Sequence, residues 1–206
     1  MKKNLGIAAL FTMVTTVIFG LIYPLVITGL AQALFPWRAN GQLMQMNGKI
    51  IGSRIIGQEF DGAGYFHSRP SAAGTGYDAT ASGGSNLAPT NHLLIERVHD
   101  AVQQAKSGNP SSPVPVDLVT ASGSGLDPDI SPAAAEFQVA RVARERGMSE
   151  AQILQIVQKN TKGRQFGVFG EPRVNVLELN LALDAVHPLR GTDSARERAS
   201  LGGSNR

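Results

Sequence analysis

The first 35 residues hold a long uncharged run that limits what this chain can become. Met1-Lys2-Lys3 is followed by residues 5–35 without one charged side chain. A helix needs about 20 apolar residues to cross a hydrocarbon core about 30 Å thick. We therefore expect an N-terminal membrane anchor over residues 1–38, with a transmembrane helix at about residues 7–30.

The charges at the two ends of this run predict its orientation. Lys2, Lys3 and the amino terminus precede it, and Arg38 follows it. Positive groups favour the cytoplasmic side, so the N-terminus should be cytoplasmic and the bulk of the chain periplasmic or extracytoplasmic. A cleaved signal peptide is the alternative, because Ala31-Gln32-Ala33 resembles a cleavage site, although signal cores usually span only about 7 to 15 residues.

Small residues recur at every fourth position of the run and form a slowly drifting stripe. The stripe consists of Ala8, Thr12, Thr16, Gly20, Pro24 and Thr28. In lipid, small side chains let two helix backbones approach closely, and threonine hydroxyls bond across the gap. The stripe is therefore a candidate surface for packing against a partner helix. It is equally compatible with the ordinary composition of a membrane span, with Pro24 as a kink.

Beyond the anchor, residues 39–189 should form one α+β domain, followed by a disordered tail at residues 190–206. The chain has 23 glycines and 11 prolines, which indicates many turns. Its net charge of +3 is not gathered in a basic stripe with interleaved aromatic residues, which argues against nucleic-acid binding. The absence of cysteine removes both a disulfide framework and a thiolate metal site.

A hairpin and four helices supply the regular elements of this domain. Residues 42–56 are interpreted as two strands around Asn47-Gly48, because both central residues of a type I′ turn need positive φ. Apolar periodicity predicts helices at about residues 91–105, 132–146, 149–160 and 176–187. Ser131 is the expected cap of the second helix, and Ser149 with Gln152 predicts a capping box on the third.

Polar loops connect these elements and, with the hydrophobic start, carry a resemblance. The loops are residues 65–71, 82–87, 120–132 and 170–175, and the resemblance also extends to residues 52–53, 56–58 and 176–177. They make the chain similar to the C subunit of the Kdp-type potassium-transporting ATPase, a bacterial P-type pump complex. The resemblance covers nearly the whole chain and is most specific in residues 119–132, whereas the tail after Leu189 has no counterpart.

The resemblance implies an accessory subunit that does not catalyse by itself. It would stabilise a high-affinity, ATP-driven potassium uptake complex in the bacterial inner membrane, with membrane lipid and the potassium-translocating and ATP-hydrolysing subunits as partners. The family is described as a catalytic chaperone that raises the ATP affinity of the hydrolysing subunit, so ATP would be met through the complex. Because ATP is cytoplasmic and this domain is expected outside, we favour an assembly or gating role at the outer face. No cofactor or metal is assigned to the chain itself.

One loop before the second helix has two interpretations. Ser122, Ser124 and Asp127 could belong to an anion-binding nest, since glycines free backbone N–H groups to converge before a helix N-terminus. Yet a P-loop pattern is absent, and Asp127 and Asp129 would repel an anion. A tight turn leading into Ser131 is the favoured interpretation.

The remaining candidates for partner contact lie in other loops. They are Gln58, Tyr65, His67, Arg69, Asn86, Glu171, Arg173 and Asn175. Histidine and arginine beside aromatic rings can clamp a carboxylate on a partner or close an internal hydrogen-bond network. Asn175 is also the expected cap of the last helix. For this set, structural roles are favoured over partner contacts.

A membrane-anchored extracytoplasmic hydrolase and a free-standing binding module are the rival classes. A hydrolase would need a serine together with His67, His92 or His99 and an aspartate. The sequence contains no Gly-x-Ser-x-Gly elbow. Its four histidines lack metal-ligand spacing, which argues against zinc.

Overall fold

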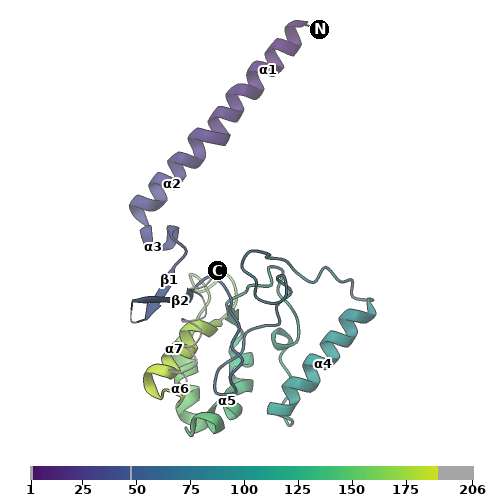
Figure 1. Ribbon diagram of the computed structural model, residues 1–206, viewed down its shortest axis with the longest axis vertical. Coiled ribbons are helices and arrows are strands. Elements are labelled where there is room, and N and C mark those ends of the chain that lie inside the picture. Colours follow the sequence, from purple (N-terminus) through teal and green to yellow (C-terminus); the bar gives the residue numbers. More distant parts are fainter. Residues whose placement is uncertain (1, 47, 190–206) are drawn as a thin grey trace, which may run out of the picture. The chain divides into compact units, whose positions relative to one another are not determined.

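Helices and short strands are interspersed along the chain in the computed structural model, which describes residues 2–46 and 48–189 (Figure 1). The mixture of helix and sheet confirms the α+β class. The chain divides into two units, Met1–Ser53 and Arg54–Arg206. Asn47 of the predicted turn and the predicted tail at residues 190–206 lie outside the described residues.

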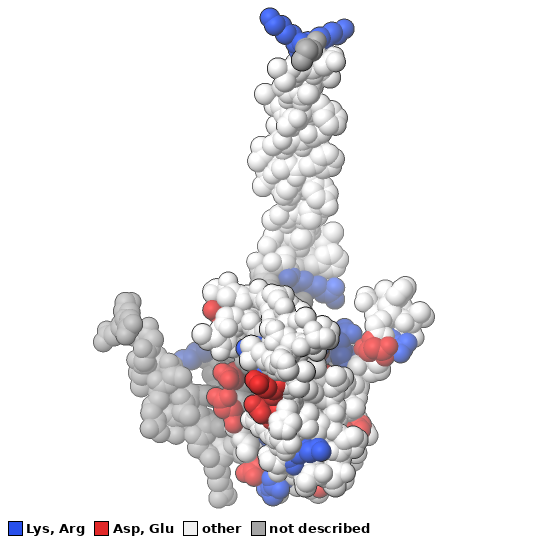
Figure 2. All heavy atoms as spheres, turned by 90° about the vertical axis from the view of Figure 1, so that its right-hand side faces the viewer, with Lys and Arg blue, Asp and Glu red and all other residues white. Residues whose placement is uncertain are grey.

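The first unit begins with a long apolar helix. α1 (Lys2–Val17), the wide turn η1 (Ile18–Ile22) and α2 (Tyr23–Leu34) follow one another without a break. Within the described residues this is the one helix long and apolar enough to cross a membrane. Figure 2 shows it as an uncharged column with basic side chains at its free end. The predicted span at residues 7–30 lies inside it.

The wide turn η1 lies directly before Pro24. In this turn the N–H of Tyr23 bonds to the carbonyl of Ile18, five residues back. Proline has no N–H, and its ring would clash with the carbonyl four residues back, which here belongs to Gly20. The wider turn therefore carries the helix past the proline without a break.

A short helix and a hairpin complete the first unit. α3 (Pro36–Ala39) leads to β1 (Leu43–Met46), which pairs antiparallel with β2 (Lys49–Ser53). This pairing confirms the predicted hairpin, and Gly48 in its turn has the expected positive φ, +76°. Its second strand ends at Ser53 rather than at residue 56, because the chain turns there and the N–H of Gly57 bonds to the Leu126 carbonyl.

The second unit contains the predicted helices. They are α4 (His92–Gly108), α5 (Pro132–Arg146), α6 (Glu150–Asn160) and α7 (Val176–Val186). The hydroxyl of Ser131 accepts from the Ala134 N–H at the start of α5, and the capping box of Ser149 and Gln152 is formed at the start of α6. α5 ends at Gly147, whose φ of +64° lets the chain reverse into α6.

Three very short strands form a sheet that the sequence analysis missed. The strand order in this sheet is β3 (Asp129–Ile130), β5 (Arg173–Asn175), β4 (Thr161–Lys162), and both outer strands pair antiparallel with β5. The short 3₁₀ helix η2 (Val116–Leu118) precedes β3 in the chain. Residues 120–132 and 170–175 were interpreted as loops, and this was wrong for β3 and β5. Strands of two or three residues are too short to show an alternating pattern.

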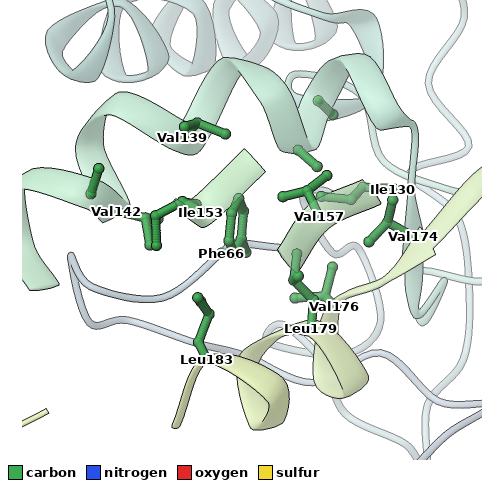
Figure 3. Packing of buried hydrophobic residues seen from close by; sticks show 13 residues of the cluster. Phe66, Ile130, Val139, Val142, Ile153, Val157, Val174, Val176, Leu179 and Leu183 are labelled. Carbon is green, nitrogen blue, oxygen red and sulfur yellow. The ribbon is translucent and has the colours of Figure 1, made fainter. Parts of the chain in front are cut away.

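The hydrophobic core lies between α5, α6 and α7, which pack together (Figure 1). Figure 3 shows Phe66 at its centre between Ile153 and Val157, with Leu179 and Leu183 below it. Phe66 comes from a predicted loop, yet its side chain is completely buried. The loop that follows Gly64 is therefore part of the core and fixes the neighbouring candidate residues.

Candidate functional site

Residues 65–77, called the arm below, hold three of the predicted site residues: Tyr65, His67 and Arg69. Buried side-chain amides bind the start of the arm. The Phe66 N–H donates to Asn180 Oδ1 at 2.8 Å, and Asn180 Nδ2 donates to the Phe66 carbonyl at 2.9 Å. Gln138 binds the His67 backbone in the same way, at 2.8 and 3.2 Å. Each side-chain amide pairs with the backbone N–H and carbonyl of one residue, as a neighbouring strand would. The arm therefore enters the core with the backbone groups of Phe66 and His67 hydrogen-bonded.

A buried arginine holds the arm at Tyr65. The Arg146 side chain is 0% exposed, and its Nη2 lies 3.0 Å from Asp184 Oδ1. It also donates to the carbonyls of Gly64 and His187, at 2.6 and 2.7 Å. Its guanidinium lies 4.9 Å from the centre of the Tyr65 ring, and the Tyr65 hydroxyl donates to Asp184 at 3.2 Å. Tyr65 thus contacts an internal ion pair.

His67 also faces groups of its own chain. Its Nε2 lies 3.2 Å from the Gly62 carbonyl. Burial, and then the nearby positive charge of Arg141, lower the pKa of His67 below its ordinary 6.5. A neutral imidazole does not bind a carboxylate as an ion pair. The geometry therefore favours the internal network over the carboxylate clamp.

The outer part of the arm borders an open groove of about 580 Å³, called the acidic groove below. Among its lining residues are Arg69, Asp117, Asp127, Asp129, Glu171 and Arg173. Four of the predicted site residues, from three separate segments, are therefore brought together here. Four carboxylates face two guanidinium groups, so the groove is acidic.

The carboxylate oxygens of Asp127 and Asp129 in this groove accept hydrogen bonds from neighbouring groups. Asp127 accepts from Arg69 Nη1 at 3.2 Å and from the Asp129 N–H at 3.1 Å. Asp129 accepts from Arg173 Nε at 3.1 Å and from Asn175 Nδ2 at 3.0 Å. These carboxylates hold the groove's own walls together, and their occupied oxygens are poorly placed to act as a general base.

Tyr77, which the sequence analysis did not single out, fixes the backbone of Arg69. Its hydroxyl donates to the Arg69 carbonyl at 2.5 Å. Burial, with smaller contributions from Glu59 and Asp61, raises the pKa of Tyr77 to about 12. The phenol therefore stays protonated and remains a donor at any physiological pH.

Residues 122–125 form a tight turn packed against the arm. The Ser124 hydroxyl accepts from the Leu126 N–H at 3.1 Å, and Ser122 Oγ lies 3.4 Å from Ser124 Oγ. Gly125 has a φ of +67°, and a Cβ there would lie 2.6 Å from the backbone nitrogen of Ala73. The geometry favours the turn over an anion-binding nest.

Three further candidates, Asn175, Gln58 and Asn86, do not line the acidic groove. Asn175 is mostly buried, caps α7 by accepting from the Glu178 N–H, and so fulfils its predicted capping role. Gln58 is half-buried, and Asn86 is exposed with a φ of +52°. Glu171 reaches both the groove and an exposed loop, where its two oxygens lie 2.7 and 2.9 Å from Arg164 Nη2.

The wide turn in the N-terminal helix affects the small-residue stripe. In an α-helix each four-residue step advances a stripe by about 40°, so five steps from Ala8 to Thr28 would drift by roughly 200°. The wide turn η1 accommodates about one extra residue and sets the phase back by roughly 100°. The stripe therefore stays closer to one face than its spacing alone predicts.

Two of the three histidines named for the rival hydrolase, His67 and His99, face groups other than serine. His67 faces the Gly62 carbonyl, and His99 lies beside Asp100 and Gln103 on the exposed side of α4. Among the residues that the structure describes, no group of three or more histidine or acidic side chains is arranged to hold a metal ion.

Comparison with known proteins identifies the family. The family model for KdpC, the c chain of the K+-transporting ATPase, matches residues 5–185. The potassium-transporting ATPase KdpC subunit of Koribacter versatilis is 62% identical over 189 residues, covering 92% of this chain and 98% of the relative. Those of Acidobacterium capsulatum and Rhodospirillum rubrum are 57% and 52% identical, covering 90% and 92% of this chain and 100% and 99% of the relatives. The chain therefore belongs to the KdpC family and is a membrane-associated subunit of a potassium-transporting ATPase.

Proposed function

We propose that this chain is a non-catalytic accessory subunit that stabilises assembly of the potassium pump from the outer side of the bacterial plasma membrane. The N-terminal helix anchors it and packs its small-residue stripe against a helix of another pump subunit. The second unit lies outside the cytoplasm, where it contacts the potassium-translocating subunit.

One observation carries this proposal: the polar groups of the arm and the acidic groove are committed to holding the second unit together. The carboxylates of Asp127 and Asp129 bind the groove's own residues, and His67 is held neutral by burial. Such an arrangement provides a stable surface rather than reactive groups. It suits a subunit whose contribution is binding.

The topology rests on charge at the ends of the helix. Lys2 and Lys3 precede an uncharged stretch that continues to Leu34, and Arg38 is the first charge after it. The positive-inside preference then places the second unit outside. Any help to the ATP-hydrolysing subunit therefore passes through the assembled complex, since ATP is on the other side of the membrane.

Purification through a C-terminal tag in mild detergent tests the assembly role. Mass spectrometry should find the other pump subunits in the preparation and an intact N-terminus carrying Lys2 and Lys3. A chain cleaved near Ala33 that purifies alone would contradict both the anchor and the subunit role. A photoreactive ATP analogue added to the complex should label the hydrolysing subunit and leave this chain unlabelled.

Cysteine labelling tests the topology without interference, because the natural chain contains no cysteine. Asn4→Cys lies at the start of the helix and Ser111→Cys in an exposed position after α4. A maleimide that cannot cross membranes should label Ser111→Cys in spheroplasts and label Asn4→Cys only after permeabilisation. The opposite pattern would refute the proposed orientation.

A further inference from the structure

An exposed loop between β4 and β5 presents apolar side chains that nothing in the second unit covers. Residues 163–170, called the aromatic loop below, are all exposed. Phe166, Val168 and Phe169 are 85%, 69% and 67% exposed, respectively. Two phenylalanines and a valine on one loop form a concentrated apolar surface, which in soluble domains marks interaction sites.

The aromatic loop has a defined conformation. The Gln165 N–H donates to the Phe169 carbonyl at 2.8 Å, and the Phe169 N–H donates back to the Gln165 carbonyl at 2.9 Å. Arg164 binds both oxygens of Glu171 at its base. The loop is therefore a small hairpin that holds its tip in one shape.

The tip itself adopts a costly backbone conformation. Phe166 has a φ of +54°, in the left-handed region that side chains other than glycine rarely occupy. Loops usually place glycine or asparagine at such positions, and in this loop Gly167 at +76° and Gly170 at +74° follow that preference, whereas Phe166 does not. An aromatic ring held outward at a strained position indicates that the ring is used.

The charges around the loop distinguish between a protein and a lipid surface. Lys162 pairs with Glu178, Arg164 with Glu171, and Arg173 with Asp129. Binding to anionic lipid headgroups depends on cations available for the lipid phosphates. Here each cation at the base of the loop has a carboxylate partner. An apolar centre with a neutralised charged rim is instead the anatomy of a protein interface.

We infer that the aromatic loop docks Phe166 and Phe169 into an apolar pocket on the outer face of a membrane-embedded subunit of the pump. This inference rests on the proposed function, because it needs the second unit on the outer side. The two rings, at about 150–250 Å² each when buried, supply well under the roughly 800 Å² per partner of a standard interface. The loop is therefore one of two attachment points, and the membrane anchor supplies the other and raises the effective concentration of the loop at its pocket.

Photo-crosslinking in the assembled complex tests the inference. Benzoylphenylalanine replaces Phe166 in the tagged full chain, and the matched control replaces Val186, which is 62% exposed at the end of α7. The expected product joins position 166 to another pump subunit, with little product from position 186. A product with lipid only, with a second copy of this chain, or equal products from both positions would overturn the inference.

A double variant, Phe166→Ser with Phe169→Ser, measures the contribution to assembly. We expect the other pump subunits to dissociate from the washed complex at least tenfold faster than from the natural chain, with Val186→Ser changing the rate less than twofold. Resistance to protease should stay unchanged, because both rings are exposed. A stable complex with the double variant would refute the docking role while leaving the proposed function standing, whereas failure of the natural chain to retain any pump subunit would overturn both.

Discussion

The buried pair of Arg146 and Asp184 makes a sharp test of how the second unit is held together. Arg146→Met keeps most of the side-chain volume but removes the charge and its hydrogen bonds. Asp184, only 9% exposed at its side chain, would then lose its ion pair with Arg146. Removing one partner of a buried ion pair destabilises a protein by about 3–5 kcal/mol, mainly because the other charge remains desolvated.

The natural chain offers a matched control on the same helix. Arg144 lies two residues away, is 67% exposed at its side chain and pairs with its exposed neighbour Glu145. Arg144→Met should change the free energy of unfolding by about 0.5 kcal/mol or less. A double variant, Arg146→Met with Asp184→Leu, removes both charges and should recover much of the loss.

Urea titration of the full chain in detergent micelles, followed by pulse proteolysis, measures these effects on the second unit. With an m value of about 2 kcal/mol per M, a loss of about 4 kcal/mol lowers the midpoint by roughly 2 M. The midpoint for Arg144→Met should stay close to that of the natural chain. Equal midpoints for Arg146→Met and Arg144→Met would refute the conclusion that the buried pair anchors the arm.

Three further predictions follow from the same structure. Gly125→Ala should lower the free energy of unfolding by about 2 kcal/mol or more, because the positive φ of Gly125 and a backbone contact at 2.6 Å both oppose a Cβ. Gly123 has open space around it, so Gly123→Ala should change the free energy of unfolding by no more than about 0.5 kcal/mol in the same titration, and equal effects of the two variants would contradict the tight turn. The pKa of His67 is lowered in the folded state, so the unfolded chain binds the proton more tightly and stability should fall as the pH drops below about 6.5. The difference between the urea midpoints at pH 7.5 and pH 5.5 should therefore be smaller in His67→Gln than in the natural chain, and an unchanged difference would rule His67 out as its source. Thr16→Leu should reduce recovery of pump subunits in detergent severalfold through loss of close helix packing, whereas Phe19→Leu should not, and identical recovery would remove the stripe as a packing surface.

Local sequence signals were sufficient for the helices and the hairpin. Ser131, Ser149 and Asn175 cap helices in the structure as their positions predicted. The interactions concerned span three residues or fewer, so they can be identified without knowing the rest of the fold. The apolar start of the chain is a still simpler signal, because length and absence of charge alone define it.

The candidate site could be predicted only in part. Arg69, Asp127 and Arg173 were named from their loops. The contact between Arg69 and Asp127 spans 58 positions, and the pairing of Arg173 with Asp129 depends on a sheet whose strands are too short to recognise. Gln138, Arg146 and Asn180 were missed, because polar residues on a helix ordinarily indicate its solvent face. The available signal was that these three polar residues occupy helix positions on the same face as apolar residues. That pattern indicates a binding partner only once the arm is known to pass along this face.

The aromatic loop shows the same division from the opposite side. Phenylalanine is usually a core residue, so the sequence offers no reason to place Phe166 and Phe169 at the surface, where the structure has them. Phe66, by contrast, lies in a polar loop and is buried at the centre of the core. By itself the sequence determined the elements whose causes are local: the apolar helix, the caps and the hairpin turn. Which aromatic side chains are buried, which carboxylates are paired and which surface is left for a partner were decided by tertiary packing, because burial depends on what segments distant in the chain bring alongside.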